Sequence, residues 1–365
     1  MKPIVLMILV VWVLSAAPDA VHGDGLPLKL GPEELVQADG ADIQVAGYSV
    51  PSFADWNSDG LNDLVIGEGG GSGKAKIRVY LNAGTESRPQ FGNYFYAISK
   101  STELTCPASG CMGCFPRVVY WDADARKDLL IGQADGMIRL FLNIGSDQEP
   151  KFDGGRFLQA GPPGSRTNID VGNRATPSAV DCNNDGRKDL VAGAHDARIH
   201  IFINEGTDTE PDFPAETFAQ ADGADLVVPG YRASPVILDL NGDGRKDILA
   251  GNTEGQLFFY SNVGTDQQPS FSGYSRVESD GVPIDLPGSP RSRPFVCYWP
   301  GGSRSGPRDG YPDVLIGAGD GKLHLYRGVP VPADLDQDGD VDFADFALFA
   351  DYWNESQASR DQPGP

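Results

Sequence analysis

The chain has 365 residues, of which 51 are Asp or Glu and 29 are Lys or Arg, so its formal net charge is −22. Such an acidic protein repels phosphate backbones, which argues against nucleic-acid binding. Apolar residues make up 40% of the sequence, enough for a core, and 46 glycines and 28 prolines are too few for a low-complexity chain.

Residues 1–23 have the pattern of a Sec-type signal peptide. Lys2 precedes the apolar run 4–17, and small and polar residues lead to Gly23, after which we expect cleavage. The run is shorter than the ~20 residues that span a bilayer, and no second apolar stretch of that length follows. We therefore expect a secreted or cell-surface protein with no membrane span.

The rest of the chain is dominated by five copies of one sequence unit. Clear copies lie near residues 51–67, 177–193 and 235–251, and weaker copies near 116–132 and 294–317. Each has a proline four residues before the first position of its turn. Those first positions are 58 to 65 residues apart, at Asp55, Tyr120, Asp181, Asp239 and Tyr298.

Each unit contains several short runs of β-forming residues. Examples are 128–132, 137–143 and 198–204, all bounded by Gly, Asp or Pro. Such runs indicate antiparallel strands. About four strands in every ~60 residues predict an all-β fold, a β-propeller of five blades with four antiparallel strands each, over residues 24–329.

Residues 30–46 are predicted to close the ring. The phrase Gln-Ala-Asp-Gly-Ala-Asp at 37–42 is repeated at 220–225, between the third and fourth units. No such phrase follows the fifth unit, which ends at Gly328. We expect residues 30–46 to pair with the last blade, which would leave no open sheet edge.

The units resemble the FG-GAP/VCBS repeats of integrin-type β-propellers. The resemblance lies in the motif D-x-[DN]-x-D-G-x-x-D, followed by a run such as Leu-Val-Ile-Gly, and it covers about residues 47–328. It implies a calcium-binding propeller. It leaves the biological role open, because one fold serves many functions.

Three of the turns have the oxygen ligands that calcium prefers, at positions one, three, five and nine, with a backbone carbonyl at position seven. The expected ligands are Asp55, Asn57, Asp59, the Leu61 carbonyl and Asp63; Asp181, Asn183, Asp185, the Arg187 carbonyl and Asp189; Asp239, Asn241, Asp243, the Arg245 carbonyl and Asp247. The alternative is a set of hydrogen-bonded Asx turns without an ion.

The other two units depart from the pattern. The second has Tyr120 in the first position and Ala125 in place of the glycine, so it binds calcium weakly or not at all. It keeps three carboxylates, Asp122, Asp124 and Asp128. The fifth begins with Tyr298 and has an insertion before Asp309, and we expect no site there.

A different calcium motif lies near the end of the chain. Residues 334–345 fit a 12-residue EF-hand loop. Its expected ligands are Asp334, Asp336, Asp338, Asp340, Asp342 and Asp345. With the helix that we expect next, the segment 330–353 resembles one half of a dockerin, although a full dockerin has two such loops. Three or four Ca²⁺ ions are expected in all, and the tail 354–365 is polar.

That helix would have one apolar face. Phe346, Phe349 and Trp353 are spaced at i, i+3 and i+7. A single loop and helix cannot bury this face alone. It docks either on the propeller or on another copy or a partner.

Five cysteines leave two interpretations open. Cys106, Cys111 and Cys114 lie within nine residues, so a disulfide there would leave one thiol free. The spacing C-x4-C-x2-C also begins an iron–sulfur pattern, which would need Cys182 or Cys297 as a further ligand.

Two aromatic pairs recur at the same position of their units, Tyr120/Trp121 and Tyr298/Trp299. They are either wedges in the core or a platform on which a sugar stacks. Two functions fit these features. One is a calcium-binding adhesion or scaffold module for an extracellular protein or polysaccharide, and the other is an extracellular polysaccharide-degrading enzyme or its accessory subunit. We favour binding, because the prominent carboxylates belong to metal turns and no acid/base pair stands out.

Overall fold

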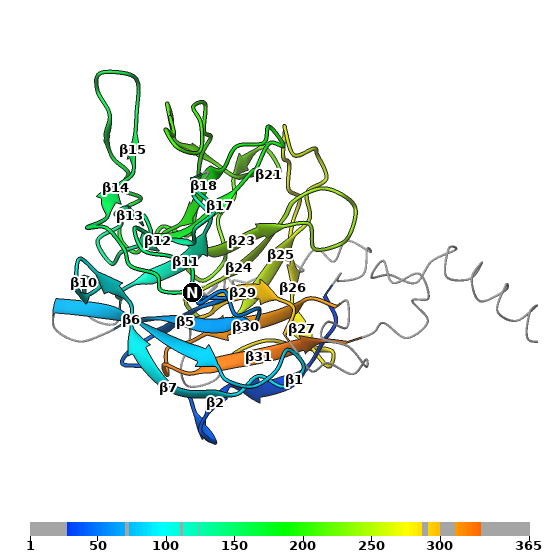
Figure 1. Cartoon of the computed structure of the whole chain (residues 1–365). Coiled ribbons are helices and arrows are strands. Elements are labelled where there is room, and N and C mark those ends of the chain that lie inside the picture. The colour runs from blue at the N-terminus through cyan, green and yellow to red at the C-terminus, as the bar shows by residue number, and fades with distance from the viewer. Residues whose placement is uncertain are drawn as a thin grey trace, which may run out of the picture.

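The computed structural model describes residues 28–69, 73–109, 112–122, 124–286, 291–299 and 311–329. Within these ranges every regular secondary-structure element is a β-strand, so the all-β prediction is confirmed. The sheets have a propeller-like arrangement (Figure 1). No membrane-spanning helix occurs in this described part. The predicted signal peptide, the EF-hand-like segment 330–353 and the tail 354–365 lie outside it.

Each unit begins with a strand that we call its inner strand. The inner strands are β4 (Ser49–Ala54), β11 (Phe115–Val119), β17 (Thr176–Val180), β23 (Ser234–Leu238) and β29 (Arg293–Cys297). They contact one another in a cycle, β4 with β11, β11 with β17, β17 with β23, β23 with β29 and β29 with β4. Each is the edge strand of its sheet, which explains why its proline, without an N–H to donate, is tolerated there.

The acidic turn leads from the inner strand to a second strand, which pairs with it antiparallel. The second strands are β5 (Asp63–Glu68), β12 (Asp128–Gly132), β18 (Asp189–Gly193), β24 (Asp247–Gly251) and β30 (Asp313–Gly317), and all their residues are buried. The third strands are β6 (Gly73–Asn82), β13 (Ile138–Phe141), β19 (Ile199–Phe202), β25 (Leu257–Tyr260) and β31 (Leu323–Gly328).

Short strands complete the periphery of the sheets. The fourth strands are β7 (Phe91–Tyr96), β14 (Arg156–Phe157), β20 (Thr217–Phe218) and β26 (Ser275–Arg276), and β10 (Thr105–Ala108) pairs with β6. Two-residue hairpins follow or precede them: β2 (Gln37–Ala38) with β3 (Ala41–Asp42), β8 (Ile98–Ser99) with β9 (Thr102–Glu103), β15 (Gln159–Ala160) with β16 (Thr167–Asn168), β21 (Gln220–Ala221) with β22 (Ala224–Asp225), and β27 (Glu278–Ser279) with β28 (Val282–Pro283).

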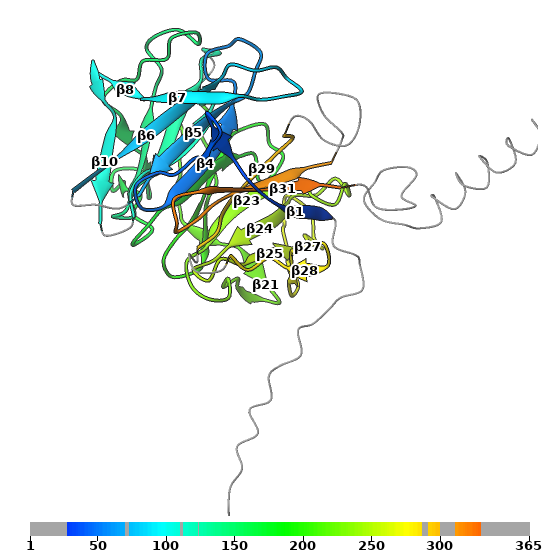
Figure 2. The ribbon, with the colours of Figure 1, turned by 90° about the horizontal axis from the view of Figure 1, so that it is seen from below.

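The last sheet joins the two ends of the described chain. Strand β1 (Leu30–Leu35) pairs antiparallel with β31, with Glu33 opposite Tyr326 (Figure 2). The β2–β3 hairpin instead lies beside β7 of the first sheet, with Ala38 opposite Phe91. The segment 30–46, expected to pair as a whole with the last unit, is therefore divided between two sheets, because the chain crosses the seam near Val36.

Neighbouring sheets are held together by apolar clusters and by close backbone contact. One cluster joins β24 and β25 to β30 and β31, and the other seams have similar clusters. Each second strand has a glycine at its last position, or next to last in β5, and a methyl group at Gly317 would overlap the carbonyl oxygen of Ser49 in the next sheet. Gly67, Gly132, Gly193 and Gly251 meet the next sheet in the same way. The recurrent Leu-Val-Ile-Gly pattern thus reflects how closely the sheets pack.

We predict that β1 contributes strongly to stability. Leu30 is 2% exposed and packs in the cluster at the last seam, so Leu30→Ala should lower the free energy of unfolding by about 2–4 kcal/mol. The exposed Glu34 on the same strand provides the control, and Glu34→Ala should cost less than about 1 kcal/mol. Urea unfolding measures both. Equal, small losses would show that β1 is not part of the cooperative fold.

Candidate metal-binding turns

Three acidic turns have one backbone geometry. In each, the fourth and sixth positions have positive φ, at 57° and 89° for Ser58 and Gly60. Asn184, Gly186, Gly242 and Gly244 occupy the same positions of the other two turns, with φ between 59° and 85°. Only Gly, Asn and a few small polar residues adopt this conformation at low cost, which explains the composition of the turns.

The turn side chains point inward onto backbone amides. The carboxylate of Asp55 accepts hydrogen bonds from the N–H groups of Asp59 (3.2 Å) and Gly60 (2.9 Å). Asn57 Oδ1 also accepts from Asp59 N–H, at 3.1 Å, and Asp59 Oδ1 accepts from Leu61 N–H, at 2.8 Å. The turns that begin at Asp181 and Asp239 repeat this arrangement closely. Oxygens from positions one, three and five are thus gathered inside each turn.

The three carboxylates of each turn repel one another. Burial raises the pKa of Asp63 to about 6, and repulsion from Asp59 and Asp55 adds to this effect although two backbone amides oppose it. The pKa of Asp247 is raised to about 6 for the same reasons, with Asp243 and Asp239 as neighbours. A bound cation would relieve this repulsion, and oxygen-only donors suit a hard cation such as Ca²⁺. The donor set therefore fits calcium. In the described residues, however, no group of three or more His, Cys, Asp or Glu is already arranged as a metal site.

The aspartate that begins each second strand, at position nine of the first four turns, is a structural element of every sheet, a role that the sequence reasoning missed. Asp63, Asp128, Asp189, Asp247 and Asp313 are at most 2% exposed. Each accepts one backbone N–H from the second position of its turn and another from a residue at the end of the third strand or two residues beyond it. In the first sheet, the donors are Trp56 (2.8 Å) and Asn82 (2.7 Å). All five units keep this carboxylate, but they also keep the aspartate four residues before it, so its presence in every unit did not reveal its structural role.

Arginine side chains distinguish the turns from one another. Arg187 Nη2 forms an ion pair with Asp185 at 2.5 Å, and Arg245 pairs with Asp243 in the same way. Leu61 occupies this position in the first turn. There Asp59 keeps the contact with Asn57 Nδ2, at 2.9 Å, which the other two turns share, but it has no arginine at this position. The first turn therefore has the least compensated negative charge.

Lysine residues link consecutive turns, a second feature that sequence reasoning missed. Lys127 Nζ contacts Asp147 of its own sheet at 2.9 Å and Ser58 of the preceding turn at 2.6 Å. Lys246 likewise pairs with Asp266 at 2.8 Å and reaches Asn184. Because Ser58 and Asn184 are the left-handed residues of their turns, each link fixes the turn of the neighbouring sheet.

The second turn is incomplete, as its sequence indicates. Tyr120 supplies no carboxylate at the first position, and Ala125 has φ of 61° where the other turns have glycine. Asp122 and Asp124 still accept backbone N–H groups, and Arg126 pairs with Asp124. The insertion of the fifth unit, at 300–310, lies outside the described residues.

The aromatic pairs are divided between core and surface. Trp121 and Trp299 are 1% and 5% exposed, and Trp299 stacks on Phe53 with ring centroids 4.6 Å apart. Tyr120 and Tyr298 are 51% and 46% exposed. Both follow the ends of inner strands, on the side of the molecule where the acidic turns lie. Only the tyrosines could therefore stack with a sugar.

The cysteine loop contains a disulfide. Cys106 and Cys114 are bonded, with Cα atoms 5.6 Å apart, and Cys111 lies outside the described residues. Cys182 and Cys297 have free thiols in two different core clusters. Since the first and third cysteines of the iron–sulfur spacing are bonded to each other, that interpretation is wrong.

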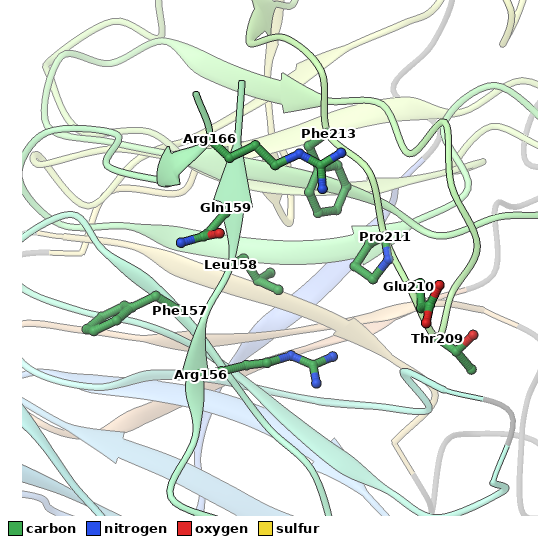
Figure 3. A pocket seen from close by; sticks show the side chains of 9 residues that line it. All are labelled: Arg156, Phe157, Leu158, Gln159, Arg166, Thr209, Glu210, Pro211 and Phe213. Atoms are coloured by element: carbon green, nitrogen blue, oxygen red, sulfur yellow. The ribbon is translucent and has the colours of Figure 1, made fainter. Parts of the chain in front are cut away.

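A cavity of about 300 Å³ lies on the periphery, away from the predicted metal ligands. Figure 3 shows Arg156 and Arg166 extending from the β14–β16 region toward the segment 209–213. Arg166 forms an ion pair with Asp212 at 2.6 Å, and Phe157, another lining residue, is 38% exposed. None of the residues predicted to bind a ligand lines this cavity.

Comparison with known proteins supports the repeat assignment. Residues 181–250, which include two acidic turns, match the FG-GAP-like repeat family. No curated protein sequence matches the chain. The GH43_1 enzyme from Xanthomonas citri is a distant structural relative, with a TM-score of 0.46 and 13% identity over 79% of this chain and 89% of that protein. Raptor from Chaetomium thermophilum gives a TM-score of 0.34 and 12% identity, over 84% of this chain and 25% of that one. Such distant similarity gives no information about activity.

We predict that the carboxylate at the start of each second strand stabilises the fold without metal. Asp313→Asn should lower the free energy of unfolding by about 2–3 kcal/mol, because an amide NH₂ would face a backbone N–H donor. The loss should be the same in calcium and in EDTA, since no site is expected in the fifth unit. The exposed Asp285 provides the control, and Asp285→Asn should change little. A loss that appears only in calcium would contradict a purely structural role.

Proposed function

We propose that the chain is an exported, calcium-stabilised β-propeller of five blades that binds an extracellular protein or glycan. The blade number is supported by the five sheets of four or more strands and by the cyclic contacts of their inner strands. The single observation that carries the calcium proposal is that three turns share one geometry, in which side-chain oxygens that can act as metal ligands lie at positions one, three and five.

Calcium would be held by the turns of units one, three and four. Asp55, Asn57 and Asp59 would supply side-chain oxygens, Leu61 its carbonyl, and Asp63 the remaining carboxylate. When bound, the ion supplies positive charge that offsets the repulsion within the turn, so ion binding and folding are coupled. The Lys127 and Lys246 links would transmit this order between neighbouring turns.

The terminal segment adds a fourth ion to the proposal. Residues 334–345 would bind it through the six aspartates of the EF-hand-like loop. The face formed by Phe346, Phe349 and Trp353 would then dock on the propeller, on another copy or on a partner.

Export and binding, rather than catalysis, fit the chemistry of the described residues best. A disulfide between Cys106 and Cys114 suits an oxidising compartment, as the signal-peptide pattern of residues 1–23 implies. The prominent carboxylates either lie in the turns or are buried with two backbone donors each. The exposed Tyr120 and Tyr298 provide contact area beside the turns.

Calcium should raise the melting temperature. A site occupied at 100 times its Kd stabilises by about 2.7 kcal/mol, or roughly 5–10 °C in a domain of this size. The triple variant Asp59→Asn, Asp185→Asn, Asp243→Asn should lose most of the shift. The double variant Asp122→Asn, Asp124→Asn is the matched control and should keep it, because the second turn lacks its first ligand. An identical melting temperature of the wild type in calcium and in EDTA would refute calcium binding.

Glycan binding should depend on the exposed tyrosines beside the turns. On a glycan array in calcium, Tyr120→Ala and Tyr298→Ala should each weaken any retained signal at least tenfold. Tyr231 is 71% exposed and precedes β23, at the opposite end of the inner strands, so Tyr231→Ala should have no effect. If no glycan is retained and a pull-down recovers a calcium-dependent protein partner, the ligand is a protein. Release of shortened polysaccharide would instead favour an enzyme.

A further inference from the structure

The inner strands enclose a space that solvent can enter. In β11, β17 and β23 the first two residues are buried, whereas the last three keep part of their surface accessible. The second strands, which lie one place further out, are entirely buried. Because the inner strands line the centre of the cycle, this accessible surface indicates an axial channel along β11, β17 and β23, closed at the starts of these strands and open toward the acidic turns. On the other two inner strands only Ala54 of β4, and Phe295 and Val296 of β29, are partly accessible.

Arg117 lies at the closed end of this channel. Its guanidinium group donates from Nη1 to the carbonyl of Pro51 at 2.9 Å and from Nη2 to that of Pro294 at 3.3 Å. In the cycle, β11 neighbours β4, and β29 lies beyond β4. A side chain from β11 that reaches β29 therefore extends into the central space. The guanidinium carbon is also 5.5 Å from the ring centroid of Phe295.

No carboxylate compensates the charge of Arg117 among the described residues. Its hydrogen-bond acceptors are three backbone carbonyls, including that of Pro116 at 3.4 Å. Burial lowers the pKa of Arg117 to about 10, and no neighbouring acid opposes this shift. Arg117 is half-buried, and a chain of net charge −22 has many carboxylates that could have been placed beside it.

Two further guanidinium groups lie near the base of the channel. Arg174 and Arg293 are 0% and 1% exposed, and both face the ring of Phe115, at 5.4 and 5.7 Å. They contact backbone or hydroxyl oxygens of Ala233, Ser234 and Ser49 at the starts of the inner strands. Positive charge is therefore concentrated at one end of the channel, opposite the acidic turns.

The remaining donors of Arg117 suit a carboxylate. A guanidinium group has five N–H donors, of which the three bonds to carbonyls use two on Nη1 and one on Nη2. The Nε–H and the second N–H of Nη2 remain, and two such donors form the planar fork that binds a carboxylate in bidentate fashion. Between Arg117 and the turns, the partly accessible residues of the inner strands include Val119, Val180, Val236 and Leu238, which also pack against the apolar clusters between sheets.

We propose that the axial channel binds a small organic carboxylate, its head group on the Arg117 fork and its apolar body along the valine- and leucine-rich inner strands. Arg117 lies two residues before the end of β11, about 7 Å at ~3.3 Å per residue, so the body is about five to six carbons long. The site does not depend on calcium, and it can be tested separately from the proposed function.

Isothermal titration of the full mature chain with sodium hexanoate tests the site. Hexanoate should bind the wild type. Acetate should bind more weakly, because each methylene group that hexanoate buries in the channel and acetate lacks should contribute about fourfold in affinity. Uncharged 1-hexanol should bind at least tenfold more weakly than hexanoate, because it has no head group for the fork. Equal binding of acetate and hexanoate would overturn the apolar channel, and equal binding of hexanol and hexanoate would overturn the anion site.

Arg117→Met should reduce hexanoate affinity at least tenfold. The matched control is Arg139→Met, which removes a half-buried guanidinium from β13 of the same sheet, where Arg139 stacks between Phe141 and Phe157. If Arg117→Met does not fold, Arg117→Lys keeps the charge without the fork and should also bind weakly. In the wild type, hexanoate should shift the Nε–H resonance of Arg117. Undiminished binding by either Arg117 variant, an unmoved resonance or no binding by the wild type would refute the proposal.

Repeating the titration in EDTA separates the two proposals. Hexanoate binding should persist without calcium in protein that remains folded, since Arg117 contacts none of the turn residues. Loss of the site with calcium present would refute this inference and leave the calcium proposal intact.

Discussion

The burial of one carboxylate in every sheet constrains the rest of the structure. An ionised group without hydrogen-bond donors could not occupy such a position, so two backbone amides must converge on it. In the first sheet, Trp56 and Asn82 supply these amides, and they come from the turn and from the end of the third strand. The residue after the turn begins and the residue at the end of the third strand must therefore both lie within hydrogen-bond distance of Asp63. The two amides converge in every unit, although the turn donor lies 7 residues before the carboxylate in four units and 14 residues before it in the fifth.

The same constraint explains how the sheets come together. Each second strand begins at the buried carboxylate and has a glycine at or next to its end. The missing side chain lets the neighbouring backbone approach closely, as Gly317 does beside the carbonyl of Ser49. The apolar clusters then form between successive sheets rather than within one, with Trp299 packed against Phe53 between the fifth and first sheets. Strand β1 pairs with β31 and places Leu30 in the cluster between the fourth and fifth sheets, so the beginning and the end of the described chain stabilise each other.

Local features of the fold were predictable from the sequence, and the features that depend on distant contacts were not. The acidic turns lie where the motif places them, because glycine and aspartate act within a few residues. Nothing local separates Asp63 from Asp59. Asp63 is buried and accepts the N–H of Asn82, nineteen residues later, and that contact is not visible in the sequence of the turn. The division of residues 30–46 between two sheets, and the burial of Trp121 but not Tyr120, likewise depend on neighbouring sheets.

Charge is separated along the inner strands, and this separation links the two proposals. The carboxylates of the turns lie at one end, and the guanidinium groups of Arg117, Arg174 and Arg293 at the other. Without cations, an anion that approached the channel would pass a ring of negative charge before it reached Arg117. Calcium in the turns would reduce this barrier through its own charge, and it would do so without contacting the anion. Calcium should therefore change the association rate of hexanoate more than its affinity for a preformed site, since affinity is set by the short-range contacts at Arg117.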